Sequence, residues 1–356
     1  MDQRALAKLF PRETLESYVR NETRESGRPL GRSRAIVIKN AELTNANGSV
    51  IVKLGETLCM CSSRMELVEP TAKKADEGLV ELSVEICAVS RERHRHGRSG
   101  DRVDRACFVR DFLSRVLFDC DGDARDGGEE CIIDKRKLSI TKGMSCWKLV
   151  CECFVVSDDA GECDACLAAI CACLRTTEVP LASVSARGET KLIGGEEEVE
   201  KGGKRVKAGR LEINREFKPV CVTTGAFNLY DDDANDDDGV VGKKRKKDDG
   251  GEKKNNKQER EEEEEDDDDD EYQHPPKQIA IVDPDYEEMK LCDALVHVIV
   301  DQNGDVLGLE KCQGSSAVDE TILAKAIQAA KLRHASVWKR IDQLDIENND
   351  EEDAME

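Results

Sequence analysis

The chain has 356 residues and a formal net charge of −22. A chain of this length is expected to form about two packed units. The negative charge is concentrated, because residues 231–271 hold 21 acidic and 9 basic side chains, a net −12. The acidity of the whole chain therefore says little about the partners of its folded part. The longest apolar run, residues 165–174, is about half of the roughly twenty residues that a membrane helix needs, and we expect a soluble protein.

The first residues predict a helix rather than a targeting segment. Charges interrupt the apolar pattern of residues 4–20, so this stretch lacks the apolar core of a secretory signal peptide. Gly and Pro within residues 26–32 end the helix. Without a secretory route, the sixteen cysteines are expected to stay reduced and to behave as small, buried apolar side chains. The predicted apolar contacts of the helix are Leu6, Leu9, Leu15, Tyr18 and Val19.

Strand patterns followed by helical patterns fill the next part of the chain. Asn47-Gly48 is a strong hairpin signal, and the strands around it alternate apolar and polar residues, which predicts an antiparallel meander. A helix over 101–118, a central strand over 145–158 and a buried helix over 162–177 come next. This order of strands and helices indicates the α+β class. The meander strands are predicted at 33–41, 49–54, 57–67 and 79–87.

The second half repeats this order, so the architecture looks duplicated. A hairpin over 291–312 turns at Asn303-Gly304, and a helix over 317–342 closes the unit. Further strands are predicted between 187 and 215, and at 219–230 and 277–284. The inner face of the closing helix is predicted to consist of Ile322, Ala326, Ala329, Ala330 and Val337.

Residues 231–276 have almost no apolar side chains, and we predict a long disordered acidic insertion in a hairpin loop. Its basic run, 243–247, is a candidate nuclear import signal, and the alternative is a charge run that only solvates the loop. The predicted divisions are an N-terminal helix at 1–25, a first half at 26–185, a second half at 186–342 interrupted by the insertion, and a loose acidic tail at 343–356.

A family resemblance begins at Arg28. The element Arg28-x-x-Gly-Arg32, the Asn47-Gly48-Ser49 hairpin and the turn at Gly55-Glu56-Thr57 resemble the opening of RNase PH family domains. The stretches 227–233 and 279–316 resemble the second half of such domains. Within the family, the chain is similar to the non-catalytic ring subunits of the eukaryotic RNA exosome. The resemblance implies an RNase PH-like fold, which is a duplicated α+β unit, over most of residues 10–230 and 277–342.

Active members of this family cleave RNA from its 3′ end with inorganic phosphate, and the resemblance places their phosphate site at the start of the helix 162–177. A bound phosphate needs free N–H groups, a hydroxyl and an arginine. Glu162, Asp164, Ala165 and Cys166 stand there instead. The two carboxylates suit the positive end of the helix dipole and would repel phosphate. We predict a helix start capped by its own side chains, and no phosphorolysis.

Three loop aspartates keep a catalytic alternative open. The resemblance makes Asp293 the counterpart of a catalytic carboxylate, whereas the simpler interpretation of Asp283, Asp285 and Asp293 is ordinary loop and strand-end acids. The segment 312–317 lies where the family has a Gly-rich turn facing phosphate. We expect Ser315 or Ser316 to cap a helix there, with anion binding as the alternative.

The cysteine-rich stretch 161–174 fits zinc spacing only superficially. Ala, Leu and Ile separate Cys163, Cys166, Cys171 and Cys173, and these residues favour a helix on which the four thiols point in different directions. We therefore expect packing residues rather than a zinc site or a thioredoxin-like redox pair. No metal and no cofactor are predicted.

A basic segment is the main candidate for RNA contact. Residues 90–98 hold four Arg and two His in an otherwise acidic chain. Arginine forks bind phosphate well, and a basic stripe is the electrostatic footprint of RNA. The resemblance adds that ring subunits line a central channel with basic loops near this position. The candidate RNA-binding residues are Arg95, Arg98, Arg102 and Arg105, and the alternative is a solvated loop that pairs with acids or with a neighbouring subunit.

Together these features predict a protein that is not an enzyme. As a structural subunit of the exosome core ring, it would support 3′–5′ RNA processing and degradation by assembling the ring and guiding single-stranded RNA through its channel. The alternatives are an active phosphorolytic 3′–5′ exoribonuclease and a stand-alone acidic RNA-binding protein. The implied partners in this hetero-oligomer are other RNase PH-like ring subunits, RNA-binding cap subunits and an associated hydrolytic nuclease. The implied locations are the nucleus, including the nucleolus, and the cytoplasm.

Overall fold

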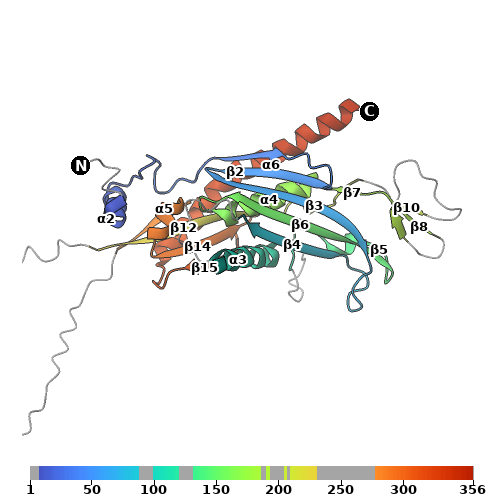
Figure 1. The fold of residues 1–356 in the computed structure, drawn as a ribbon, viewed down its shortest axis with the longest axis horizontal. Helices are drawn as coiled ribbons and strands as arrows, with labels where there is room; N and C mark the ends of the chain where they lie inside the picture. Colours follow the sequence, from blue (N-terminus) through green and yellow to red (C-terminus); the bar gives the residue numbers. More distant parts are fainter. Residues whose placement is uncertain are drawn as a thin grey trace, which may run out of the picture. The chain divides into compact units, whose positions relative to one another are not determined.

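The computed structural model describes residues 8–87, 99–119, 131–185, 190–192, 204–206, 209–230 and 277–355. Contacts group the chain into a large unit, Met1–Phe227 with Gln278–Glu356, and a small unit, Asn228–Lys277. The described helices all lie in the large unit (Figure 1). The predicted disordered insertion at 231–276, with its basic run, lies outside the described residues.

A large mixed sheet forms the first half. Its strands follow the order β1 (Ile36–Asn40), β2 (Gly48–Leu54), β3 (Thr57–Val68), β6 (Ser145–Ser157) and β4 (Leu79–Ile86), and β5 (Ser139–Thr141) also pairs with β6. The predicted meander is confirmed for β1, β2 and β3, and β6 is central as expected. The prediction was wrong for β4, which pairs with β6 in parallel. A parallel pair needs a long crossover, and the chain between β4 and β6 supplies one that contains a helix.

Helix α4 (Glu162–Thr176) lies against one face of this sheet, as Figure 1 shows. The buried helix predicted over 162–177 is confirmed, since each of its residues from Glu162 to Arg175 is buried. Ala and Cys dominate its sequence, and such small side chains let a helix backbone approach the strands closely. Two longer helices flank it, α3 (Ser99–Leu117) beside β4 and α6 (Glu320–Met355) beside β1.

A second sheet forms the C-terminal half, in the order β13 (Lys277–Val282), β12 (Val220–Leu229), β14 (Ala294–Val300) and β15 (Val306–Gln313). The β14–β15 hairpin is confirmed, and Gly304 in its turn has a φ of 83°. Helix α6 packs on β14 with the predicted inner face, because Ile322, Ala326, Ala329, Ala330 and Val337 are all buried. The short elements are α5 (Tyr286–Leu291), the 3-10 helix η2 (Lys135–Leu138), β7 (Glu178–Val179), β8 (Ala182–Val184), β9 (Thr190–Leu192), β10 (Lys204–Val206) and β11 (Gly209–Arg210).

Both ends of the described chain differ from the prediction. The N-terminal helix α2 covers Pro11–Arg20, because Pro favours the first helical position and disfavours helix in the residue before it. Leu15 and Val19 are buried as expected, but Leu9, which is helical and separated from α2 by a break at Phe10, is exposed. The predicted acidic tail is helical as far as Met355, since α6 continues to that residue and contains no Gly or Pro that would end it.

The structure bears on two further expectations, one about membrane-spanning helices and one about the cysteine thiols. No helix among the described residues is both long and apolar enough to cross a membrane. Fourteen described cysteines are free thiols, as predicted, but Cys131 is disulfide-bonded, so the expectation of fully reduced cysteines was wrong at that position.

The α4 packing gives a stability prediction. Leu174 on α4 is fully buried, so Leu174→Ala leaves a cavity and should lower the free energy of unfolding by about 2–5 kcal/mol. Leu332 on α6 is 73% exposed, so Leu332→Ala should change it by about 0.5 kcal/mol or less. Urea denaturation of the purified chain measures both values. Equal losses for the two variants would contradict the packing assigned to α4.

Candidate functional site

The start of α4 is the candidate site, because the family resemblance implies a phosphate site at the start of this helix. Gly161 is the N-cap residue, has a φ of 74° and provides no side-chain cap. The prediction that Glu162 and Asp164 cap the helix was therefore wrong. A Cβ atom at Gly161 would lie 2.8 Å from an amino group of Arg34, so glycine lets that guanidinium approach the helix start.

Glu162 is bound by an arginine of helix α3. Arg105 donates from Nε to the Glu162 carboxylate at 3.0 Å and from an amino nitrogen to Asp158 at 3.0 Å. Burial raises the pKa of Glu162, but the charge and hydrogen bonds of Arg105 outweigh it, so the pKa is held below its usual value. The charge of Glu162 in turn raises the pKa of Arg105. This cation is therefore already neutralised by protein carboxylates.

Asp164 points from the first turn of α4 into the second sheet. Its carboxylate accepts hydrogen bonds from the Thr223 hydroxyl at 2.7 Å, from the Thr223 backbone N–H at 3.2 Å and from Arg333 at 3.0 Å. Burial raises the pKa of Asp164, and the charge of Arg333 only partly offsets this. Nδ1 of His297 lies 2.9 Å from the same hydroxyl, and burial lowers the pKa of His297. Asp164 therefore joins α4 to β12 and α6.

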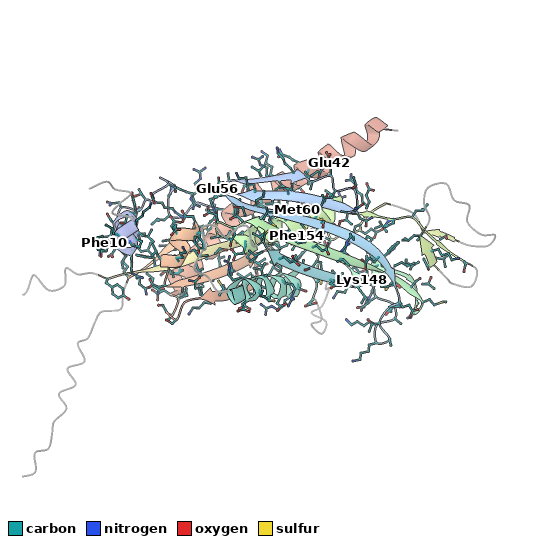
Figure 2. All side chains as sticks on the ribbon, viewed as in Figure 1. Phe10, Glu42, Glu56, Met60, Lys148 and Phe154 are labelled. Carbon is teal, nitrogen blue, oxygen red and sulfur yellow. The ribbon has the colours of Figure 1, made fainter. Side chains whose placement is uncertain are left out.

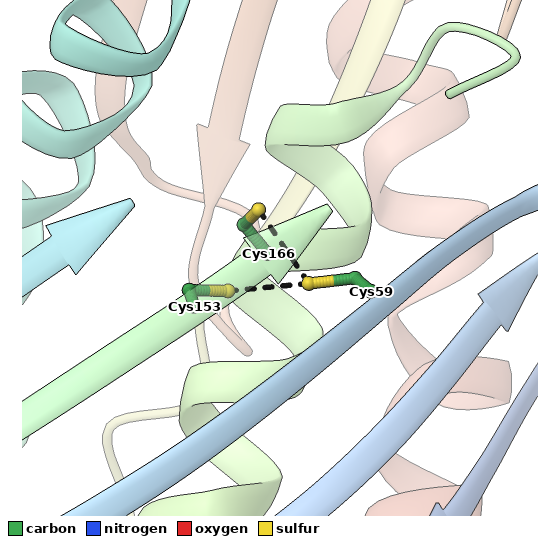
Figure 3. A group of neighbouring side chains, drawn as sticks. All are labelled: Cys59, Cys153 and Cys166. Atoms are coloured by element: carbon green, nitrogen blue, oxygen red, sulfur yellow. Dashed lines mark hydrogen bonds between the residues drawn. The ribbon is translucent and has the colours of Figure 1, made fainter. Parts of the chain in front are cut away.

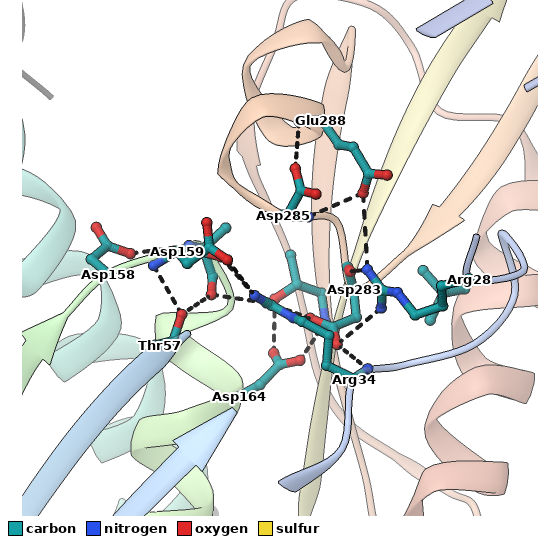
Figure 4. A network of polar contacts seen from close by, with 12 residues as sticks. Arg28, Arg34, Thr57, Asp158, Asp159, Asp164, Asp283, Asp285 and Glu288 are labelled. Atoms are coloured by element: carbon teal, nitrogen blue, oxygen red, sulfur yellow. Dashed lines mark hydrogen bonds and ion pairs between the residues drawn. The ribbon is translucent and has the colours of Figure 1, made fainter. Parts of the chain in front are cut away.

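Asp283 is the centre of the polar network beside this helix start, and Figure 4 shows it facing Arg34 and Arg28. Its side chain is fully buried and accepts from the Arg34 backbone N–H at 2.6 Å, from Nε at 3.1 Å and from an amino nitrogen at 2.7 Å. Arg28 adds a contact at 3.4 Å. Burial raises the pKa of Asp283, but the hydrogen bonds and charge of Arg34 lower it below the usual value.

The N-terminal segment is tied into the same network. Arg24 is buried and donates to Glu288 at 2.8 Å and to the Leu30 carbonyl at 2.7 Å. Asp285 begins α5 with a capping box, in which its carboxylate accepts from the Glu288 N–H and Glu288 accepts from the Asp285 N–H. These contacts give Asp285 a structural role in the described structure.

Asp293, the residue implied as a catalytic counterpart, faces helix α2. Two amino nitrogens of Arg12 donate to its carboxylate at 3.1 Å, and the Arg12 guanidinium lies 5.0 Å from the centre of the Phe227 ring. A Cβ atom at Gly314, where φ is 86°, would lie 1.8 Å from the Asp293 carbonyl oxygen. The glycine turn in 312–317 therefore packs on Asp293. The predicted cap by Ser315 or Ser316 was wrong, because α6 begins at Glu320.

Among the side chains that the structure describes, the charges around the start of α4 leave no positive excess for an anion. Carboxylates outnumber guanidinium groups six to five in the paired network that surrounds it. Phosphate binding relies on unneutralised donors and positive charge. The acids are Asp158, Asp159, Glu162, Asp164, Asp283 and Glu288, and the arginines are Arg24, Arg28, Arg34, Arg105 and Arg333.

The structure locates only part of the predicted RNA-binding set. Arg95 and Arg98 lie outside the described residues, and Arg102 falls in α3, where the course of the backbone alone is described. The side chain of Arg105 is 32% exposed and binds Glu162 and Asp158, so RNA would compete with these acids for it. The RNA role of all four remains a prediction.

Sequence reasoning missed Arg34, Arg333 and the central position of Asp283. Arg34 follows the Arg28-x-x-Gly-Arg32 element, and its neighbourhood was therefore visible, but its partner is 249 residues away. Arg333 was hidden on a helix assessed only for its apolar face. No local sequence pattern indicates that Asp283, rather than another loop aspartate, is buried.

Comparison with known proteins places the chain in a family. Residues 32–180 match domain 1 of the 3′ exoribonuclease (RNase PH) family, and residues 276–333 match domain 2. Two solved structures share the fold, each at 20% identity with a TM-score of 0.59. The Archaeoglobus fulgidus exosome with RNA bound to the active site matches 94% of this chain and 99% of its own, and an archaeal exosome core matches 96% and 100%.

The mixed α+β, two-domain fold and the two family matches together define the class: the chain belongs to the RNase PH 3′ exoribonuclease family. Similar curated proteins are the exosome complex component rrp43 of Schizosaccharomyces pombe, with 25% identity over 49% of this chain and 60% of the relative, and the exosome complex component Rrp42 of Methanothermobacter thermautotrophicus, with 27% identity over 49% and 59%. The chain thus spans about three fifths of the length of these relatives.

The Asp283 network predicts a pH-dependent stability. Asn tolerates the left-handed backbone at this residue (φ 51°), so Asp283→Asn removes the charge without adding strain. We expect a loss of about 3–5 kcal/mol in unfolding free energy at pH 7, because buried arginines lose their partner. The pKa of Asp283 is lowered in the folded state, so its contribution is complete above the unfolded value of about 3.9, decreases as the pH falls below that value, and is lost only below the folded-state pKa.

The measurement is denaturant unfolding of both proteins at pH 7 and near pH 3, where the difference between their stabilities should be smaller than at pH 7. Asp76→Asn is the matched control, since Asp76 is 57% exposed and pairs with Lys142 at 3.5 Å. The control should cost about 0–1 kcal/mol. A loss for Asp283→Asn that is the same at both pH values would contradict the charge-based explanation.

Proposed function

We propose that this chain is a non-catalytic subunit of the RNA exosome core ring, resembling exosome component eight. The proposal is supported by family membership and by relatives named as exosome components. In this role the chain helps to assemble the ring and guides single-stranded RNA toward a nuclease carried by another subunit. It thereby supports 3′–5′ RNA processing and degradation, including rRNA processing, without cleaving RNA itself.

One observation carries the non-catalytic part of the proposal. At the start of α4 two acidic side chains, Glu162 and Asp164, stand where the family resemblance implies a phosphate site, and they are bound by Arg105 and Arg333. A phosphate ion would have to displace these carboxylates and would meet like charge. Asp293 also supports the absence of catalysis, since its carboxylate already accepts hydrogen bonds from both amino nitrogens of Arg12.

The outer face of the large sheet supports a role in assembly. Residues that point away from α4 include Met60 and Phe154, which are paired on neighbouring strands and half-buried, as Figure 2 shows. Val37 and Val156 are 40% and 42% exposed. Grouped apolar side chains on a sheet face are typical of surfaces that bind another protein. We assign this face, with the sheet edges, to neighbouring ring subunits.

The basic segment supports a path for RNA. Its arginines at 95, 98, 102 and 105 run into the start of α3, and Arg105 reaches the acids at the start of α4. In a ring, this end of each subunit would present guanidinium groups to the phosphate backbone of a strand that passes by. RNA-binding cap subunits and a hydrolytic nuclease complete the proposed assembly, in the nucleus, the nucleolus and the cytoplasm.

Phosphate-dependent RNA cleavage tests the non-catalytic assignment. The purified chain, alone and with copurified ring partners, is incubated with 3′-labelled single-stranded RNA and inorganic phosphate. We expect no release of nucleoside diphosphates, because the carboxylates at the start of α4 would repel the phosphate ion. Release that disappears in Asp293→Asn and persists in Asp285→Asn would overturn the assignment in favour of an active phosphorolytic exoribonuclease.

Copurification tests the ring itself. Tagged full-length chain should bring down other RNase PH-like subunits in a complex whose native mass exceeds that of the single chain several-fold. Its recovery as a lone RNA-binding protein would contradict the assignment to a ring.

Charge reversal tests the RNA path. Arg95→Glu combined with Arg98→Glu should reduce the protection of RNA by the assembled ring, and each lost phosphate contact should lower the salt dependence of binding by about one unit of slope. The ring should still assemble. A control that reverses Lys74 and Lys142, both exposed and remote in sequence, should leave protection unchanged. Unchanged protection in the arginine variant would remove these residues from the path.

A further inference from the structure

Six buried cysteines line the interface between α4 and the large sheet. A spacing of two residues puts both thiols of a strand on one face, and a spacing of seven residues does the same on a helix. Thiols from three elements, distant in sequence, therefore meet in one layer. They are Cys59 and Cys61 on β3, Cys151 and Cys153 on β6, and Cys166 and Cys173 on α4, and each is fully buried as a free thiol.

Three of these thiols converge, as Figure 3 shows. The sulfur of Cys59 lies 3.2 Å from that of Cys153 and 3.7 Å from that of Cys166, and all three sulfurs lie within 4.8 Å of one another. A zinc–sulfur bond of about 2.3 Å places the sulfurs of a tetrahedral site about 3.8 Å apart. The Cys59–Cys166 separation matches this value, and the Cys59–Cys153 separation would have to widen by about 0.6 Å around a bound ion.

We propose that Cys59, Cys153 and Cys166 bind one thiophilic metal ion with a filled d shell, zinc(II) or copper(I). Each thiol still protonated releases its proton to solvent as its sulfur–metal bond forms, and no residue is oxidised. Thiolate ligands select these soft ions over magnesium or calcium. Sequence reasoning predicted no metal because it considered only the four thiols of one helix. Those four indeed do not converge, since Cys163 and Cys166 lie in different groups, and the missing ligands come from the sheet.

The two ions differ in the fourth ligand. Copper(I) accepts three thiolates, whereas a structural zinc site is closed by four ligands. Cys61 pairs directly with Cys153 across β3 and β6 but is outside the group of thiols whose sulfurs lie within 4.8 Å of one another, so its side chain would have to move in to close a zinc site. Since every sulfur is buried, the ion enters before α4 closes on the sheet, so metal binding is linked to folding.

The test measures metal content in the full chain expressed with added zinc or copper and purified without chelator. We expect about one ion per chain by elemental mass spectrometry. Cys59→Ala, Cys153→Ala and Cys166→Ala should each reduce it to background, and Cys171→Ala, which removes another buried thiol of α4, should not. Loss of zinc but retention of copper in Cys61→Ala would distinguish the two coordination modes.

Two results would overturn the proposal: wild-type protein at background for both metals, or equal metal content in the wild type and the Cys166→Ala variant. Far-ultraviolet circular dichroism verifies that the variants fold. If the variants do not fold, the test is the ultraviolet absorption of the wild-type chain loaded with cadmium. Sulfur-to-cadmium charge-transfer absorption of three or four thiolates supports the site, and its absence removes it.

Discussion

The structure depends on how the fully buried carboxylate of Asp283 is compensated. An isolated charge in a protein interior is prohibitively costly, so it persists only where donors surround it. Here Arg34 provides three donor groups to this carboxylate and Arg28 a fourth. Arg333 approaches from α6 to 4.0 Å. The chain following α2, the loop after β13 and the C-terminal helix are thereby fixed to one point.

This arrangement explains why the start of α4 can be acidic. A helix N-terminus attracts negative charge, and in phosphate-binding proteins that charge belongs to the ligand. In this chain Glu162 and Asp164 supply it, and their remaining cost is met by Arg105 and Arg333. The negative charge that the helix N-terminus attracts therefore comes from the protein and not from a bound phosphate. This is the physical basis for proposing a subunit that shapes an RNA path and does not cleave RNA. The cost of burying this charge is visible at Asp164, because burial raises its pKa even though Arg333 lies beside it.

The fold was predictable where its signals are local. Strand β6 and the inner face of α6 agree with the sequence because apolar spacing indicates the buried side, and α4 agrees because its apolar run is nearly continuous. The parallel pairing of β4 was missed because alternation does not report strand direction. The site was only half predictable. The acidic first turn of α4, with Glu162 and Asp164, was visible in the sequence, whereas their arginine partners, 57 and 169 residues away, were not.

The sequence by itself determined the class of the fold, the burial of α4 and the chemical character of its first turn, since these depend on composition and on spacing within one element. Tertiary structure decided which charges neutralise each other and which cysteines meet. Asp283 and Arg34, like Cys59 and Cys166, become neighbours only when separate strands and helices pack. Long-range pairing leaves no periodic trace in a single sequence, because each partner keeps the same local pattern whether or not the other is present.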